Sequence, residues 1–140
     1  MAVSGPQWCI EGLQQAADAV LLDNATPEDK ELILFSNDAT ITDATANADL
    51  TEITTNGGEK VTLTKATWTA ATAADPVASV YNSGTGVVFT ITGALTIYGW
   101  AIRGVTSTDI YAAENFGVNT VANGNTVTIN PVTINWDIPE

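Results

Sequence analysis

The sequence predicts a mainly β fold, a jelly-roll-like β-sandwich preceded by one N-terminal helix. Three observations lead to this expectation. From Glu31 onward, apolar and polar residues alternate with the period of a strand. Clusters of Gly, Asn and Ser interrupt this pattern about every 8–12 residues, which is typical of sandwiches and barrels. Close to the N-terminus, by contrast, the apolar residues recur with the period of a helix.

The predicted helix covers residues 4–22. Ser4 and Gln7 have the spacing of a capping box at its start. Its apolar stripe is formed by Cys9, Leu13, Ala16, Ala17 and Val20. An acidic segment with turn-forming residues follows. We therefore expect residues 1–30 to form an N-terminal helix and acidic linker, and residues 31–140 to form the β-sandwich domain.

The first strands are expected between residues 31 and 93. Residues 31–35 predict a short buried strand, and residues 38–52 predict a polar loop. In residues 59–72 the apolar positions change from odd to even, which indicates a bulge near Lys65. Residues 75–93 predict a loop and then a hairpin that turns at residues 83–86. In that hairpin Val87, Phe89 and Ile91 are expected to face one way.

The segment "LTIYGWAIRG", Leu95 to Gly104, is apolar on both faces and predicts a central strand. Gly99 is expected to let another backbone or ring pack closely against it. Another strand is predicted over residues 108–117. The closing residues 118–136 contain Asn123-Gly124, a hairpin signal, and Pro131, which indicates a bulge or an edge. Two packed sheets are expected to bury Trp68, Phe89, Trp100 and Trp136 in one core.

The charge of the chain limits its partners. Four cations stand against sixteen carboxylates, which gives a net charge of −12. Nucleic acids and anionic membranes are bound by clustered Lys and Arg, and the sequence has no such cluster. We therefore expect no nucleic acid and no membrane among its partners, and a neutral or basic protein surface instead.

Few residues suggest chemistry. The chain has no histidine, which excludes serine and cysteine catalytic triads and the common zinc sites. Cys9 is the single cysteine, so no internal disulfide forms. Asp38, Asp43 and Asp49 crowd one loop with Glu52. This pattern favours a solvated acidic loop, although calcium binding and a carboxylate-pair enzyme stay open. We expect no catalytic, cofactor-binding or metal-ligating residues.

Arg103 is the only arginine and ends the apolar strand. We expect it at the sheet rim, pairing with a carboxylate of its own subunit or of a neighbour rather than acting in catalysis. The predicted interface residues are Arg103, Trp8, Leu13 and Trp136.

The order of features resembles a known group of proteins. The segments that carry the likeness are "ELILFSNDATITDATANADLTEIT", "KATWTA", "IYGWAIRG", "DIYAAENF" and "VANGNTVTINPVTINW". Together they resemble small structural proteins of tailed bacteriophages, over most of the chain from Gln7 to Trp136. The resemblance implies a β-sandwich on the outside of the virion, with no catalytic residues to carry over.

Two functions follow from the resemblance. The first is a decoration or cement protein that binds the major capsid protein and clamps neighbouring capsomers, made in the host cytoplasm and favoured to be a homotrimer. The alternative is a tail or fibre component that binds host surfaces or carbohydrates. That alternative expects exposed aromatic residues near a loop cluster, and Trp8, Tyr81, Tyr111 and Trp136 are the candidates.

Overall fold

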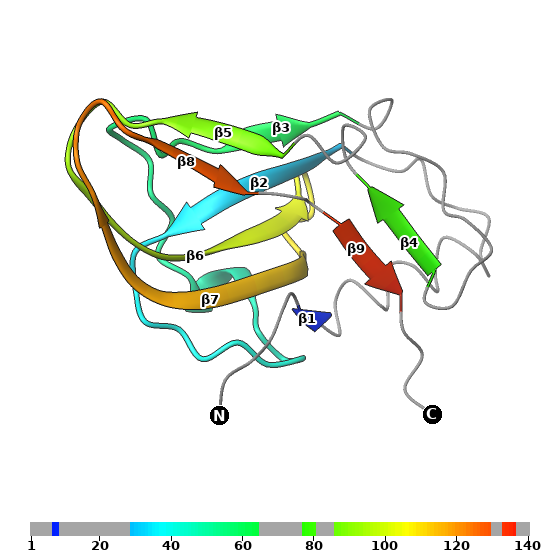
Figure 1. Ribbon diagram of the computed structural model, residues 1–140. Coiled ribbons are helices and arrows are strands. Elements are labelled where there is room, and N and C mark those ends of the chain that lie inside the picture. The colour runs from blue at the N-terminus through cyan, green and yellow to red at the C-terminus, as the bar shows by residue number, and fades with distance from the viewer. Residues whose placement is uncertain (1–6, 9–28, 65–76, 81–85, 130–132, 137–140) are drawn as a thin grey trace.

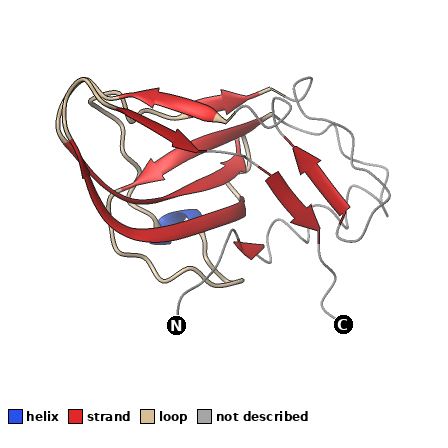
Figure 2. Cartoon of the chain, viewed as in Figure 1, coloured by secondary structure: helices blue, strands red, loops and turns tan. Residues whose placement is uncertain are grey.

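The computed structural model is mainly β, and every strand pair in its described part is antiparallel (Figures 1 and 2). The structure describes residues 7–8, 29–64, 77–80, 86–129 and 133–136. The strands are β1 (Gln7–Trp8), β2 (Lys30–Phe35), β3 (Val61–Leu63), β4 (Val77–Val80), β5 (Val87–Thr90), β6 (Leu95–Gly104), β7 (Ile110–Val121), β8 (Thr126–Ile129) and β9 (Thr133–Trp136). One turn of 3-10 helix, η1 (Asn47–Asp49), lies in the loop between β2 and β3.

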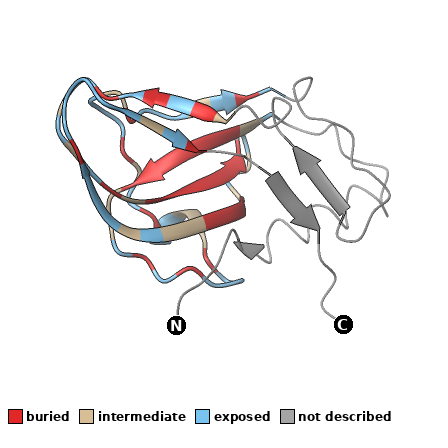
Figure 3. Cartoon of the chain, in the orientation of Figure 1, coloured by how far each residue is buried: buried red, intermediate tan, exposed pale blue. Residues whose placement is uncertain are grey.

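A five-stranded sheet in the order β1-β7-β6-β2-β3 forms the centre of the described fold. The expectation that residues 95–104 form a central strand is confirmed, because β6 lies between β7 and β2. In β2 all residues after Lys30 are buried, and in β6 all residues from Gly99 are buried (Figure 3). Strands with both faces covered lose the alternation of a half-exposed strand, which is why these two read as continuous apolar runs.

The pair β5-β8 covers one face of this sheet (Figure 1). Side chains from both layers meet in one core, and β5 alternates between buried and exposed positions as its sequence predicts. The buried members of that core are Leu32, Leu34, Ile53, Leu63, Val87, Phe89, Ile91, Ile97, Trp100, Ile102, Tyr111, Ala112, Val121 and Ile129. Phe89 and Trp100 thus share a core, as expected. The side chains of Trp68 and Trp136 lie outside the described residues.

The loop of residues 36–52 covers the opposite face of the sheet. Its small and apolar side chains pack against odd-numbered residues of β2 and against β6 and β7. The buried members of this second core are Ile33, Phe35, Ala39, Ile41, Leu50, Ala101, Ile110 and Ala113. A segment that looks polar in sequence therefore supplies a covering layer, because Ala39, Ile41 and Leu50 turn inward while Asp38, Asp43 and Asp49 are exposed.

The close approach predicted at Gly99 is confirmed. A Cβ atom at this position would overlap the backbone oxygen of Glu114 and the ring of Phe35. Glu114 lies on the neighbouring strand β7, and Phe35 lies opposite Gly99 on β2. Glycine is required here because two neighbours occupy the space that any other side chain needs.

Strands β5 to β8 form one long antiparallel ribbon that bends between the two layers. Leu95 pairs with Val121 at one side of the bend, and Thr90 pairs with Thr126 at the other. The same number of residues lies between these pairs on both strands, so the register continues through the bend. At the bend Ile91 accepts a hydrogen bond from the Gly124 N–H at 2.8 Å.

This bend corrects the hairpin predicted at Asn123-Gly124. The turn forms, with Gly124 at a φ of +87°, but its flanking strands β7 and β8 do not pair with each other. The Gly124 N–H instead donates to Ile91, which lies in the bend between β5 and β6. The chain therefore crosses from one layer to the other at this turn. An Asn-Gly pair predicts that the chain turns at this point. It does not predict whether the two flanking strands pair with each other or belong to different sheets.

The hairpin predicted within residues 75–93 is also wrong. β4 pairs with β9, and β5 pairs with β8, so the two strands belong to different sheets. Each finds its partner near the C-terminal end of the chain, which local turn signals do not reveal. The turn residues 83–85, the bulge near Lys65 and the bend at Pro131 lie outside the described residues.

The predicted N-terminal helix is not supported. Gln7 and Trp8 form strand β1, in which they pair with Ala113 and Ala112 of β7. Residue 7 therefore cannot complete a capping box with Ser4, because the edge of β7 takes up its backbone as a strand. Residues 9–22, with the predicted apolar stripe and Leu13, lie outside the described residues.

Candidate functional site

Arg103 lies at the centre of a buried group of charges. It is opposite Glu31 in the register of β6 and β2, and it is 6% exposed, against 2% for Glu31. Its Nε atom donates to Glu31 Oε1 at 2.7 Å, and its Nη2 atom lies 2.8 Å from Glu52 Oε2. Its Nη1 atom donates to Asn47 Oδ1 at 2.7 Å. Lys60 Nζ lies 2.9 Å from Glu31 Oε2.

This group, Arg103, Glu31, Glu52, Asn47 and Lys60, confirms that Arg103 pairs with carboxylates of its own chain. Arg103 lies at the end of its strand as predicted, since it is the next-to-last residue of β6, but it is buried there, because the loop of residues 36–52 folds over this face and supplies Asn47 and Glu52. All three guanidinium nitrogens have a partner within the chain. Through these charge-assisted contacts Arg103 ties the covering loop to the sheet.

The acidic loop forms no cluster of ligands in its described residues. Asp38 accepts a hydrogen bond from Asn115 at 2.9 Å, and Asp49 accepts one from the Ala46 N–H at 2.9 Å. Across the described part of the chain, no three His, Cys, Asp or Glu side chains come together as a metal site would require. These two carboxylates instead fix the shape of the loop.

A bulge in β7 displays two apolar side chains. Asn115 pairs with Gly99 and Asn119 pairs with Ile97, so residues 116–118 stand opposite Tyr98 alone. Gly117 has a φ of +82°, which lets the extra residues turn outward. Phe116 is 44% exposed and Val118 is 66% exposed. We call residues Phe116–Val118 the apolar bulge.

Asn115 holds the apolar bulge in place. Its Oδ1 atom accepts the Gly117 N–H at 2.8 Å, while its Nδ2 atom donates to Asp38 Oδ1 at 2.9 Å and to the Ala39 carbonyl at 2.7 Å. One amide group therefore fixes the conformation of the bulge and anchors it to the covering loop. The same contacts bring the exposed carboxylate of Asp38 next to the apolar bulge.

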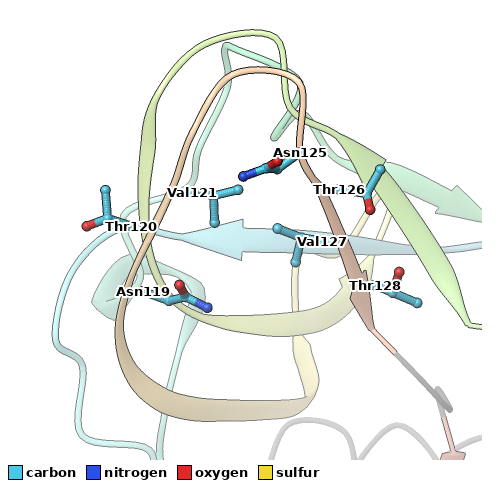
Figure 4. A pocket seen from close by; sticks show the side chains of 7 residues that line it. All are labelled: Asn119, Thr120, Val121, Asn125, Thr126, Val127 and Thr128. Atoms are coloured by element: carbon cyan, nitrogen blue, oxygen red, sulfur yellow. The ribbon is translucent and has the colours of Figure 1, made fainter.

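A polar hollow of about 520 Å³ lies where β7 crosses to β8 (Figure 4). Its side chains carry amide, hydroxyl and small apolar groups, and Figure 4 shows Val121 and Val127 in the middle, with the Asn and Thr side chains around them. The lining residues are Asn119, Thr120, Val121, Asn125, Thr126, Val127 and Thr128. The lining holds neither an ionisable group nor an aromatic ring.

The structure does not test the sequence-predicted interface residues as a set. The backbone of Trp8 lies in β1 and that of Trp136 in β9, while Leu13 and the side chains of both Trp residues lie outside the described residues. Tyr111, a candidate aromatic of the carbohydrate-binding alternative, is buried in the main core. The interface assignment of these residues stays a prediction.

The apolar bulge is the feature that the sequence reasoning missed. The run Asn115-Phe116-Gly117-Val118 carries a signal, because a glycine inside a strand pattern often marks a bulge. Its meaning depends on the register with β6, which the sequence does not give.

Comparison of the chain with protein-family models, with curated proteins and with solved structures finds no match in any of the three. Among the described residues, none of the helical structure is long or apolar enough to cross a membrane.

Proposed function

We propose that this chain is a structural protein of a bacteriophage virion that decorates the outer capsid and cements neighbouring capsomers by protein–protein contacts. The observation that carries the proposal is the apolar bulge, in which Phe116 and Val118 are exposed on a rigid sheet. Apolar side chains exposed close together form a patch, and contiguous patches, unlike single exposed residues, mark protein-binding surfaces. The resemblance of the sequence to phage structural proteins supplies the biological setting.

The arrangement of charge supports a role in assembly rather than catalysis. Three cations lie in the described residues, and each contacts a group of the same chain: Arg103 and Lys60 pair with glutamates, and Lys30 lies 4.3 Å from the ring centre of Tyr111. The described residues hold nine Asp and Glu side chains against these three cations, and an acidic surface of this kind keeps separate copies soluble before they bind.

The fold that we infer is a β-sandwich of the jelly-roll type. The bent ribbon of β5 to β8 supports it, because a long antiparallel ribbon folded across two layers is the construction of a jelly roll. The five-stranded sheet and the β5-β8 pair are the two packed layers. On this proposal the protein is a homotrimer on the capsid exterior, its partner is the major capsid protein, and it is synthesised in the host cytoplasm.

The second candidate is a tail or fibre module that binds carbohydrate on a host surface. The polar hollow at the crossing of β7 and β8 favours it, since amide and hydroxyl groups suit sugar hydroxyls. The hollow ranks second because its lining has no aromatic ring on which a sugar could stack.

Copy number on purified virions tests the proposal. Quantitative mass spectrometry should find the chain in a fixed ratio to the major capsid protein, and virions without it should release DNA at a lower temperature. A few copies per virion, confined to the tail, would overturn capsid decoration and favour the second candidate. Binding of the isolated chain to sugars on a glycan array would do so too.

A further inference from the structure

We propose that the apolar bulge is the docking point itself, and that it takes an apolar protein surface bordered by lysine or arginine side chains. This inference rests on the proposed function, because it names the chemistry of the partner in that assembly. The observations that carry it are the geometry of Phe116–Val118 and the charge beside them.

The geometry makes the bulge suitable for binding. Asn115 fixes Gly117 through its Oδ1 atom and joins the covering loop through its Nδ2 atom. Binding therefore does not have to order this segment, so less conformational entropy is lost on association. Phe116 and Val118 have separate exposed positions on the two sides of Gly117, and aromatic side chains such as that of Phe116 are enriched in the buried cores of interfaces.

The charge beside the bulge selects the kind of partner. Asp38 is exposed and lies against Asn115, the residue before Phe116. Among the described residues Asp38 forms no ion pair, so no cation of the chain is bound to it. A second copy of this chain, with its net charge of −12, would bring more negative charge to the same place. A partner with a basic border around an apolar surface is the complementary one.

Virions assembled without this chain are the probe. Fluorescently labelled chain is added to them, and bound chain is measured after sedimentation across a concentration series. The wild-type chain should bind to saturation. Replacing both bulge residues, Phe116→Ser with Val118→Ser, should weaken binding about tenfold or more, because a loss of this size is usual for central interface residues. Val88→Ser is the matched control, since Val88 is 56% exposed in β5, away from the bulge, and should bind as wild type does.

The charge is tested with Asp38→Asn, which keeps an oxygen that can accept the Asn115 hydrogen bond. This variant should bind several-fold more weakly at low salt, and its binding should depend less on salt than that of the wild type. Glu59→Gln is the matched control, because Glu59 is an exposed acid next to β3, at the opposite edge of the five-stranded sheet.

The outcomes separate this inference from the proposed function. If the wild type saturates the virions and the double bulge variant does so equally well, the docking point is elsewhere and capsid decoration still stands. If the wild type does not bind at all, both proposals fail. Sedimentation velocity of the free chain gives a third outcome: self-association that the bulge variant abolishes would make the bulge a contact between copies and overturn the inferred partner.

Discussion

Replacing Arg103 by Met should destabilise the fold through the carboxylate that it leaves behind. Met keeps an apolar stem of similar length but removes every guanidinium contact. Glu31, which is 2% exposed, would then retain only Lys60 as a counter-charge among the described residues, and Lys60 is about half exposed. Breaking one side of a buried ion pair costs about 3–5 kcal/mol in general.

The lower end of that range applies here. Lys60 still compensates Glu31 in part, and Glu52, whose side chain is 23% exposed, can regain water when the guanidinium is gone. We therefore expect Arg103→Met to lower the free energy of unfolding by about 3 kcal/mol. Whole domains have about 5–15 kcal/mol in total, so a loss of this size should lower the Tm by roughly 10 °C.

Urea unfolding followed by tryptophan fluorescence measures this change. The double variant Glu31→Gln with Arg103→Met should be more stable than Arg103→Met alone, because it no longer buries a carboxylate that has lost its main counter-charge. Lys60→Met is the control for an exposed partner and should cost no more than about 1 kcal/mol. A loss of unfolding free energy below about 1 kcal/mol for Arg103→Met would refute the reasoning. So would a double variant whose loss equals the sum of the losses of Glu31→Gln and Arg103→Met measured separately.

Further changes test other parts of the fold. Gly99→Ala should cost about 3 kcal/mol by chemical unfolding, because its Cβ meets backbone; Gly124→Ala, with a positive φ but open space, should cost only about 1 kcal/mol. Equal losses would contradict the packing argument. Asn37→Ala should lower the free energy of unfolding by about 1–2 kcal/mol, since the amide group bonds to the backbone of Asp49 and Thr51. An unchanged Tm would show that these two hydrogen bonds do not stabilise the loop. Phe116→Ser with Val118→Ser should change the unfolding free energy by no more than about 0.5 kcal/mol. A larger loss would show that the two side chains stabilise the fold itself and are not free for a partner.

The strands with strong apolar character were predictable from sequence. β2, β5 and β6 follow from runs such as Leu95–Gly104, and the need for Gly99 follows from its place within a buried strand. Their partners were less predictable. The turn at Asn123-Gly124 is correct as a turn, yet its hydrogen bonds go to Ile91, far away in sequence. Pairing is a long-range property, and local propensity does not encode it.

In the candidate site, too, the features set by local sequence were predictable and those set by long-range pairing were not. A carboxylate partner for Arg103 followed from the acidic composition, whereas its burial did not, because that depends on residues 36–52 folding over the sheet. The apolar bulge needed the register of β6 and β7 before Phe116 and Val118 could be placed. At the N-terminus, Gln7 and Trp8 were predicted to lie in the helix of residues 4–22, but they pair with the edge of β7 as strand β1.

The bent ribbon has a consequence for the order of folding. β6 and β7 are joined by a short turn, so their pairing can start there and proceed through the bend to β5 and β8 with little loop-closure entropy at each step. β2 reaches β6 from much farther away, since Glu31 and Arg103 are 72 residues apart. We expect the ribbon to form in the folding transition state and β2 to dock afterwards. Arg103→Met should then accelerate unfolding and leave the folding rate nearly unchanged.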